Sequence, residues 1–394
     1  MKKLYIIIAS IVIITSPFGC IPPHAIGAVE KRWKSCGDVF RKKGIKVTFI
    51  SKKPEIHDEL PSDNIYIKGY NRTGKWWLDF VLDFVYSLYA LTISPKADAI
   101  VLNTAWTPVI LPLFKWKYKV SLYNVARFPK KQFKFYKAVD ILSCVSNIVY
   151  KSLIEQTESS QRQACVISNF IDTDVYKKSI EHNIKETPII LYTGRINREK
   201  GIDLLVRAVN SVNRKHKVRL KLVGAYETSK GGSGKEYKEE LDKMADGWTI
   251  EWHDPIYNPK DLAKEMDKCD IYCYPSLADK GETFGVAPLE AMGLGLPTIV
   301  SSLDCFSDFL KDKENGLVFN HHSKYAVEEL TNCINKIIES PELYKHLSEN
   351  AVKSSTSFNV ESKAEEYLTV LTNMMCYRRT GFDIHELKIK KILK

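Results

Sequence analysis

The chain has 394 residues, of which 44% are hydrophobic and 27% charged, so it is a globular chain with room for two domains and not a disordered or fibrous one. Nine scattered Cys without a C-x-x-C pair argue against a disulfide framework or a zinc finger and favour a reducing compartment. The net charge of +11 is uneven, because residues 1–180 contain 27 Lys+Arg and 14 Asp+Glu whereas residues 181–394 contain 31 and 33.

The amino end carries two lysines and then an apolar run over residues 4–15. This run resembles a secretory signal, and Cys20 adds the alternative of an exported lipoprotein. Against both, Pro and Phe stand shortly before Cys20, where processing needs small residues, and the run is shorter than the roughly 20 residues that span a bilayer. Because it is rich in β-branched residues, we predict a buried first strand over residues 11–16. Residues 4–10 stay unplaced and could touch a membrane.

From residue 11 onward, short β-rich runs alternate with longer helical patterns. This alternation is typical of parallel sheets with helices on both faces, so we predict the α/β class with two doubly wound, Rossmann-like domains. In the first domain, strands are predicted over residues 11–16, 47–51, 65–68, 99–103, 120–123, 140–145 and 165–168. In the second, they are predicted over residues 189–193, 219–224, 249–252, 270–274, 298–301 and 317–319.

The domain boundary is predicted near residue 185, because residues 176–186 are polar and lack periodicity, and Pro188 then opens an apolar strand. This division gives a first domain over residues 1–185 and a second over 186–376. Residues 341–376 are predicted to be helical, and we expect this carboxyl-terminal segment to cross back and pack on the first domain. Residues 377–394 form a basic tail.

The segment Trp76–Ile93 is predicted to be a helix with only one polar stripe. Asp79, Asp83 and Ser87 recur every four residues, and the other faces are apolar. We predict that this helix is buried in its own domain, with the stripe facing water. A membrane-facing helix is the alternative, which two carboxylates without basic residues suit poorly.

Residues 124–137 mix cations with aromatic side chains. Such a stretch could attract nucleic acid, anionic lipid or a phosphorylated substrate, and its charge alone does not choose among them. Alternatively, the aromatic side chains pack under a helix while the lysines are merely solvated.

A loop with two cations is predicted at the first strand of the second domain. Gly194 follows the strand over residues 189–193, and Arg195 and Lys200 come before the next helix. Open parallel sheets bind ligands at the carboxyl ends of their strands. Two cations there could stabilise a diphosphate, most strongly as it leaves with full charge. By itself this pattern is weak, since a solvated surface loop would look the same.

The most specific pattern lies in residues 274–297. A strand leads into a loop that ends at Gly285, and a helix begins near residues 287–288, where proline is tolerated. Free N–H groups at such a helix start suit a phosphate. Glu282 precedes the helix, where a sugar attached to that phosphate would lie, and Glu290 stands inside it, where a carboxylate can accept hydrogen bonds from both hydroxyls of a ribose.

Both segments, their order and their separation resemble the carboxyl-terminal domain of the retaining glycosyltransferases of family 4. The resemblance is strongest over residues 188–319 and includes the E-x(7)-E pattern at Glu282 and Glu290; it is weaker in residues 26–30, 144–146 and 168–172. It implies the GT-B architecture, in which two Rossmann-like domains face each other across a cleft.

The resemblance also implies roles for particular residues. Arg195 and Lys200 would hold the donor diphosphate, Glu290 the ribose, and Glu282 with the backbone of Phe284 and Gly285 the donor sugar. The loop at residues 254–256 would meet the base. The expected catalytic residues are therefore Glu282, Arg195 and Lys200. The expected donor-binding residues are Gly194, Phe284, Gly285, Val286 and Glu290. No metal site and no cofactor are expected, since the nucleotide-diphosphate sugar is a substrate.

The first domain departs from the family pattern. Residues 123–124 are Tyr-Asn where the family often has a histidine, and a turn with two prolines, residues 19–24, replaces a glycine-rich one. After Ser301-Ser302, the family's Gly-Gly and glutamate are also changed. The acceptor-side residues that we nevertheless expect are Gly27, Asn124, Arg127 and Lys130. Their setting favours a lipid-linked phosphate acceptor or an anionic membrane.

Two further motifs are set aside. Asp172-Thr-Asp174 imitates a D-x-D metal site of another glycosyltransferase fold, but its setting matches a family-4 loop. Residues 231–235 imitate a phosphate loop, but Glu236 stands where a magnesium-binding Ser or Thr belongs, so a flexible surface turn is expected. The nine His show no metal-ligand spacing.

We therefore predict a glycosyltransferase that moves a sugar from a nucleotide-diphosphate sugar to a hydroxyl of a glycan or lipid-linked acceptor, with retention, in surface, capsular or exo-polysaccharide biosynthesis. It would be cytoplasmic, with peripheral contact to the inner face of an anionic membrane and no nucleic-acid partner. Replacing Arg195 and Lys200 together by Ala should abolish turnover with little loss of fold. The alternatives are a nucleotide-sugar epimerase of similar shape and a non-enzymatic basic nucleic-acid-binding module.

Overall fold

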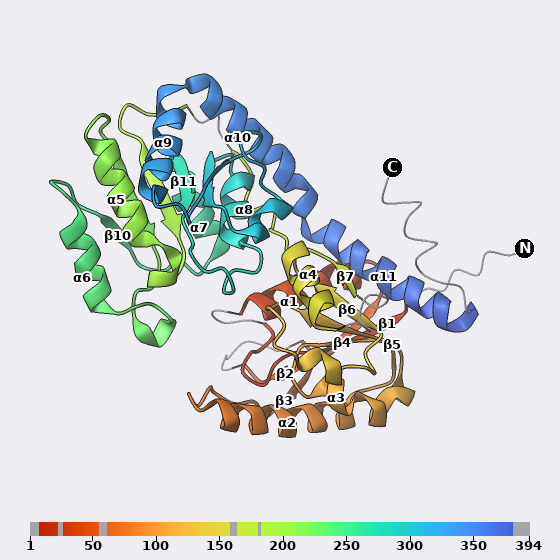
Figure 1. Cartoon of the computed structure of the whole chain (residues 1–394). Helices are drawn as coiled ribbons and strands as arrows, with labels where there is room; N and C mark the ends of the chain where they lie inside the picture. Colours follow the sequence, from red (N-terminus) through yellow and green to blue (C-terminus); the bar gives the residue numbers. More distant parts are fainter. Residues whose placement is uncertain (1–7, 23–26, 55–60, 158–163, 180–182, 381–394) are drawn as a thin grey trace, which may run out of the picture. The chain divides into compact units, whose positions relative to one another are not determined.

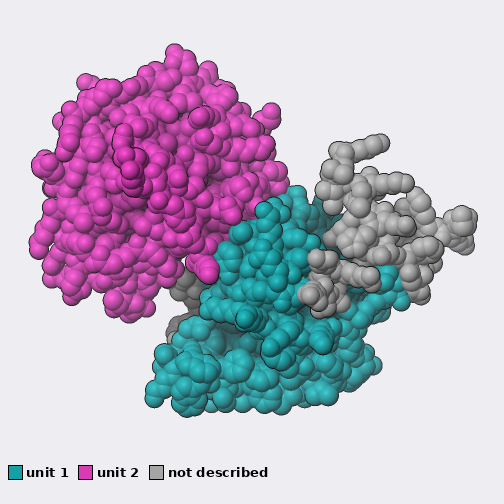
Figure 2. All heavy atoms as spheres, in the orientation of Figure 1, with its two compact units in different colours: residues 1–169, 360–394 teal, residues 170–359 magenta. Residues whose placement is uncertain are grey.

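A computed structural model describes residues 8–22, 27–54, 61–157, 164–179 and 183–380 (Figure 1). The chain divides into two units, unit 1 with residues 1–169 and 360–394, and unit 2 with residues 170–359 (Figure 2). Each unit is built on a parallel sheet flanked by helices, which confirms the predicted α/β class with two Rossmann-like domains.

Within its described residues, unit 1 has a seven-stranded sheet in the order β3-β2-β1-β4-β5-β6-β7. Every neighbouring pair is parallel. Its strands are β1 (Ser10–Ile14), β2 (Lys46–Lys52), β3 (Ile65–Ile67), β4 (Ala97–Leu102), β5 (Tyr118–Val125), β6 (Ile141–Cys144) and β7 (Ala164–Val166). Its helices are α1 (Ala28–Lys42), α2 (Trp76–Ile93), α3 (Thr107–Ile110), α4 (Asn147–Gln156) and α11 (Val360–Thr380), with 3-10 turns η1 (Leu111–Lys117) and η2 (Gln132–Phe135).

Within its described residues, unit 2 has a six-stranded parallel sheet in the order β10-β9-β8-β11-β12-β13. Its strands are β8 (Ile189–Thr193), β9 (Arg219–Val223), β10 (Glu251–His253), β11 (Ile271–Tyr274), β12 (Thr298–Ser301) and β13 (Leu317–Phe319). Its helices are α5 (Ile202–Asn213), α6 (Lys235–Met244), α7 (Pro259–Met266), α8 (Val286–Gly293), α9 (Ala326–Glu339) and α10 (Pro341–Ser355). Its 3-10 turns are η4 (Arg198–Lys200), η5 (Thr228–Lys230), η6 (Asp304–Asp308) and η7 (Thr356–Phe358).

The predicted strands are all present, with ends that differ by at most two residues. The first one, β1, lies at the centre of its sheet between β2 and β4, and residues Ile11 to Ile14 are almost fully buried. The apolar run at residues 11–16 is therefore a core strand, as its β-branched composition predicts. Residues 1–7 and 381–394, which include part of the unplaced extension and most of the basic tail, lie outside the described residues.

The division between the units differs from the predicted boundary at residue 185, because it falls at residue 170. The backbone of the preceding segment is already part of unit 2: Ile171 N donates to Phe358 O at 2.9 Å, and Lys178 N donates to Gly293 O at 3.1 Å. Residues 176–179 and 183–186 therefore belong to unit 2, and their polar composition does not mark its start.

The carboxyl-terminal helical region is also divided between the units. Helix α10 belongs to unit 2, whereas α11 belongs to unit 1 and packs on α1 and β5. There the buried ring of Tyr367 lies 4.8 Å from the ring of Trp33, and Lys43 Nζ lies 2.7 Å from a carboxylate oxygen of Glu365. The predicted return of this segment to the first domain is therefore made by residues 360–380, and they are counted with unit 1.

The orientation of α2 is the opposite of the predicted one. Asp83 and Ser87 of the polar stripe are buried, whereas the tryptophans at its amino end and most of its other apolar side chains are exposed. The stripe faces inward because the protein satisfies it: Asp83 Oδ1 accepts hydrogen bonds from the backbone N–H groups of Ala105 and Trp106 at 3.1 and 3.2 Å. The periodicity of the sequence indicates a polar stripe, but it does not show whether water or other protein groups form hydrogen bonds with its side chains.

Candidate functional site

The candidate site lies at the carboxyl edge of the sheet in unit 2, where β8 and β11 are neighbours. The chain proceeds from β8 to β9 on one side and returns through β11 on the other, so the strand order reverses between β8 and β11. In doubly wound folds this reversal opens a crevice between the loops that follow the two strands, and ligands bind there. The loops at residues 194–201 and 275–285 carry the cations and the carboxylate predicted from the sequence.

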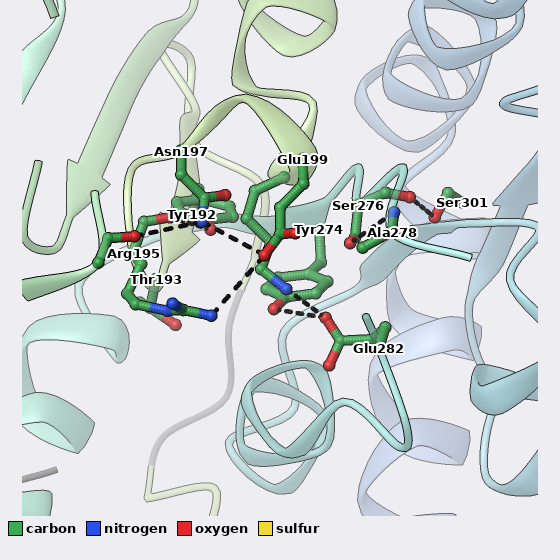
Figure 3. A network of polar contacts seen from close by, with 12 residues as sticks. Tyr192, Thr193, Arg195, Asn197, Glu199, Tyr274, Ser276, Ala278, Glu282 and Ser301 are labelled. Atoms are coloured by element: carbon green, nitrogen blue, oxygen red, sulfur yellow. Dashed lines mark hydrogen bonds and ion pairs between the residues drawn. The ribbon is translucent and has the colours of Figure 1, made fainter. Parts of the chain in front are cut away.

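Lys200 and Glu282 meet directly at this point. Lys200 Nζ lies 2.6 Å from Glu282 Oε2, and the two side chains are only 7% and 13% exposed. Tyr274, the last residue of β11, donates its hydroxyl to the same carboxylate oxygen at 3.0 Å (Figure 3). Burial and the neighbouring carboxylate of Glu282 hold the pKa of Tyr274 well above its usual value, so this phenol stays a donor.

A stack of tyrosines supports this arrangement from the sheet. The ring of Tyr274 lies 5.5 Å from that of Tyr192 and nearly parallel to it, and the Tyr192 hydroxyl donates to the carbonyl oxygen of Arg195 at 2.9 Å (Figure 3). Lys200 Nζ lies 5.5 Å from the centre of the Tyr274 ring, within the range of a cation–π contact. Two adjacent strands thus fix the loop backbone and the lysine together.

The two loops cross so closely that a glycine is needed. Gly201 has φ of +64°, and a Cβ there would lie 2.2 Å from the carbonyl oxygen of Pro275. Next to it, Leu277 N donates to Glu199 O at 2.8 Å. The backbone therefore ties the loop after β8 to the loop after β11, which keeps Lys200 beside Glu282.

Arg195 is held more loosely. Its side chain is 49% exposed, and its Nη2 lies 3.7 Å from a carboxylate oxygen of Glu199 (Figure 3). Its guanidinium also lies against Gly231, where a Cβ would come within 2.7 Å of Nη1. A half-exposed guanidinium with one weak partner can turn toward an anionic ligand at small cost.

The glycine-rich segment 231–234 is a part of the site neighbourhood that sequence reasoning missed. It is not a detached surface turn: Ser233 N donates to Ile196 O at 3.0 Å, and the Ser233 hydroxyl accepts from Arg198 N at 3.1 Å. The glycines in the sequence could have indicated this close packing, because glycine is needed where two backbone segments approach each other. A Cβ at Gly232 would lie 2.2 Å from the carbonyl oxygen of Tyr226.

Helix α8 starts at this edge behind Gly285. Gly285 has φ of +88°, and a Cβ there would lie 2.5 Å from the ring of Phe306. The N-cap residue Gly285 has no side chain that could cap α8, and the first N–H groups of this helix, at Val286 and Ala287, are suited to an anion. Phe284 is buried against Phe309, with ring centres 5.1 Å apart, so only its backbone can contact a ligand.

Glu290 is placed by the second turn of α8 and is half-buried. The hydroxyl of Tyr176 hydrogen-bonds to it, and burial followed by this carboxylate raises the pKa of Tyr176. Tyr176 had no signal in the sequence, because it lies in the polar segment assigned to the linker.

The acceptor-side residues predicted in unit 1 have different surroundings. Asn124 is buried, and its side-chain oxygen accepts from Arg32 at 3.2 Å, so it acts inside the domain. Arg127 and Lys130 are exposed, and Gly27 precedes α1. Of residues 124–137, Phe133 and Tyr136 pack together with ring centres 5.2 Å apart, whereas the four lysines are exposed. The packing alternative therefore applies to these two rings.

The two motifs that were set aside have local partners. Asp172 Oδ1 accepts hydrogen bonds from the backbone of Asp174 and Val175 at 3.1 and 3.3 Å, which makes this D-x-D a turn.

Three side chains that sequence spacing did not group do come together: His321 and His322 each place Nε2 at 3.3 Å from Asp279 Oδ1. Their ligand atoms lie close enough to share a metal ion, a grouping that the spacing of the histidines in the sequence does not indicate.

Comparison with known proteins supports a relationship that is strongest in unit 2. Residues 174–354 match the family model "Glycosyl transferases group 1". A D-inositol 3-phosphate glycosyltransferase from a Nocardioides species is 22% identical over 64% of this chain and 56% of its own length. The chain spans 31% to 56% of the length of this and the next curated relative it matches.

Solved structures extend the likeness to most of the chain. A sucrose-phosphate synthase from Thermosynechococcus elongatus matches with a TM-score of 0.74 at 19% identity, covering 94% of this chain and 99% of the other. Anabaena HepE in complex with UDP and glucose matches with a TM-score of 0.69 at 17% identity, covering 92% and 99%. Residues 174–354 are thus similar to the group 1 glycosyltransferases, and most of the chain shares the GT-B fold of these solved structures.

Proposed function

We propose that this chain transfers a sugar from a nucleotide-diphosphate sugar to a hydroxyl group of a glycan or lipid-linked acceptor, with retention of configuration. The observation that carries the proposal is the Lys200–Glu282 pair at the reversal point of the sheet, in the loops that precede α5 and α8. Relatives support the donor class, since one of the solved structures similar to this chain holds UDP and glucose.

The donor diphosphate would lie between Arg195, Lys200 and the amino end of α8. All three supply positive charge or N–H donors at the carboxyl edge of the sheet. Their contribution grows as the bond between sugar and phosphate breaks, because the departing diphosphate then carries its full charge. The anomeric carbon would pass through an oxocarbenium-like state, and the leaving phosphate would take the proton of the acceptor hydroxyl.

Glu282 has two functions in this proposal. Before the donor binds, it compensates the buried charge of Lys200, as the 2.6 Å contact indicates. When the diphosphate approaches, Lys200 gains an anionic partner, and the carboxylate of Glu282 can accept hydrogen bonds from hydroxyls of the donor sugar. The hydroxyl of Tyr274 keeps this carboxylate in place in both states.

Glu290 would bind the ribose hydroxyls of the nucleotide. In the structure the hydroxyl of Tyr176 hydrogen-bonds to this carboxylate and helps to hold it in place. We expect the base to lie near residues 254–256, which follow β10 at the same edge of the sheet.

The remaining features are proposed from the resemblance and from the charge distribution. The reaction would proceed without a metal ion, since Arg195, Lys200 and α8 can neutralise the diphosphate. The pathway would be surface, capsular or exo-polysaccharide biosynthesis in the cytoplasm, with Arg127 and Lys130 on the acceptor side. Addition of a chelator should leave transfer unchanged, and a loss of activity that Mg²⁺ or Mn²⁺ restores would contradict the metal-free scheme.

The experiment is a binding screen of the full chain against UDP, GDP, ADP and CDP by thermal shift and calorimetry. One nucleotide should raise the melting temperature specifically, because a ligand that binds only the folded state stabilises it. Glu290→Gln should weaken this ligand at least tenfold, whereas Glu328→Gln on α9 should not. If no nucleotide binds, the proposal fails.

The same preparation separates the alternatives. Incubation with the donor sugar alone should give no isomerised sugar, which an epimerase would produce. Binding of oligonucleotides that falls steeply with salt and is unaffected by Glu290→Gln would instead favour a nucleic-acid-binding module.

A further inference from the structure

Helix α2 presents an apolar face to solvent that carries no charged side chain. The exposed positions come in adjacent pairs every four residues, from Trp76 and Trp77 to Leu88 and Tyr89. Apart from Thr92 near the end, all of them are aromatic or aliphatic, and Trp76 is 80% exposed. Soluble monomers rarely leave so continuous an apolar surface uncovered, so this face calls for a partner.

The inner side of the helix is fixed to unit 1 by polar contacts. Besides its bonds to Ala105 and Trp106, Asp83 accepts from the Ser87 hydroxyl at 3.2 Å, and Ser87 Oγ lies 2.8 Å from Thr104 Oγ1. Rotation of α2 would break these buried contacts and leave a carboxyl group without donors. The apolar face is therefore held outward by the fold.

The 3-10 turn η1 continues the same surface. It contacts α2 and exposes Leu113 and Trp116, which are 71% and 67% exposed. Lys117 joins the two elements, because its Nζ donates to the carbonyl oxygens of Leu91 and Thr92 at 2.8 Å, at the carboxyl end of α2. Figure 1 shows α2 along the outer edge of unit 1, with α3 beside it. In the chain, η1 follows α3 directly.

Cations border this surface. Lys75 is exposed immediately before α2, and the ammonium group of Lys96 lies 5.0 Å from the centre of the Trp116 ring. Both acidic side chains of α2, Asp79 and Asp83, have donors of unit 1 as partners: Thr73 N donates to Asp79 at 2.9 Å. An apolar face with aromatic side chains and a border of lysines complements a bilayer with anionic headgroups.

We propose that α2 and η1 form a docking surface for an anionic lipid bilayer. Helix α2 lies in the plane of the interface, with its exposed apolar side chains among the acyl chains and Lys75 and Lys96 at the headgroup phosphates. By length and composition alone α2 could cross a membrane, but 28% of it is buried and this inner side is fixed to unit 1 by polar contacts, so it lies on the membrane and does not span it. Its 18 residues give a contact about 27 Å long.

The test is flotation of the full chain with vesicles of phosphatidylcholine alone or with phosphatidylglycerol added. Wild-type chain should float with the anionic vesicles. The variant Trp77→Gln/Val81→Gln/Val85→Gln replaces three side chains that are about half-exposed and should lower binding at least tenfold, because each loses apolar area that the lipid would bury. Tyr325→Gln, at an exposed tyrosine of unit 2, is the matched control and should bind as wild type.

A second variant tests whether misfolding of the first variant could explain a loss of binding. Leu113→Gln/Trp116→Gln changes the neighbouring turn without touching α2 and should also weaken vesicle binding. Lys75→Gln/Lys96→Gln should weaken binding to anionic vesicles by about fivefold for each lysine and leave binding to neutral vesicles unchanged. Wild-type tryptophan fluorescence should be quenched by brominated lipid, and less so in the first variant.

A second copy of the chain is the competing occupant of this surface. Its signature would be a stable dimer in sedimentation experiments that the triple variant abolishes, together with no flotation of the wild type, and this result would overturn the proposal. Flotation that the variants leave unchanged would overturn it as well. Vesicle binding needs no sugar donor, and the triple variant should bind nucleotides normally, so failure here and failure of the proposed function are separate results.

Discussion

Lys200 and Glu282 form a nearly buried ion pair, Nζ to Oε2 2.6 Å, between loops that follow two neighbouring parallel strands. This contact links stability to the proposed chemistry, because the charge available to a diphosphate is also the charge that compensates a buried carboxylate. Variants at this pair therefore have to be judged by folding as well as by activity.

Lys200→Met should destabilise the protein by about 3 kcal/mol, since removing one partner leaves the other charge buried without compensation. The buried contact thus predicts a larger loss of stability than the sequence alone does for alanine at Arg195 and Lys200 together. The double variant Lys200→Met/Glu282→Gln should recover most of the loss, as urea unfolding would show. Equal stability of Lys200→Met and wild type would mean that the pair does not form in solution.

Arg195→Ala should have the opposite profile, because its side chain is about half exposed and makes one weak ion pair. Its melting temperature should stay within one or two degrees of wild type. Affinity for the nucleoside diphosphate should fall about 30-fold, which corresponds to about 2 kcal/mol for a lost hydrogen bond to a charged group. Calorimetry measures both enthalpy and affinity, and Arg214→Ala outside the site serves as control. Unchanged affinity would remove Arg195 from the diphosphate site.

The glycine at the loop crossing can be tested with a matched pair. Gly201 and Gly247 both have positive φ, of +64° and +76°, but a Cβ at Gly247 would meet nothing within 4 Å, whereas one at Gly201 would approach the carbonyl oxygen of Pro275. Gly247→Ala should cost about 1 kcal/mol, the ordinary penalty of this backbone conformation. Gly201→Ala should cost clearly more, by thermal or urea unfolding, and should also weaken nucleotide binding. Equal losses would show that the loops can separate without cost.

Much of this arrangement follows from the sequence, and the remainder depends on distant partners. Apolar, β-branched runs predict β1 and β8, because a buried parallel strand needs little beyond such a run. The same strand order brings Lys200 and Glu282 to one edge, but the sequence does not show that they bind each other before any ligand arrives. Tyr176 as a partner of Glu290 has no local signal at all, since residues far apart in the chain make that contact.

The orientation of α2 shows the limit of periodicity most clearly. The four-residue spacing of Asp83 and Ser87 predicts a stripe correctly, yet the stripe faces protein, because the backbone N–H groups of Ala105 and Trp106 replace water. Those donors lie more than 20 residues after Asp83 in the chain, in a turn whose position depends on β4.

The burial of Asp83 has a consequence for the pH dependence of stability. Burial raises the pKa of its carboxyl group to about 6, against the lowering effect of the N–H groups of Trp106 and Ala105, the Ser87 hydroxyl and Arg72. The folded state therefore binds the proton more tightly than the unfolded state, whose carboxyl titrates near 4. The contribution of Asp83 to stability is present below about pH 4 and is lost as the pH rises to about 6, by about 3 kcal/mol at most.

Asp83→Asn removes this titration and keeps an acceptor oxygen for the two N–H groups. Its free energy of unfolding relative to wild type should therefore rise between pH 4.5 and pH 7, as urea titrations at both values would measure. A constant difference across this range would mean that the Asp83 carboxyl is already ionised in the folded protein at pH 4.5.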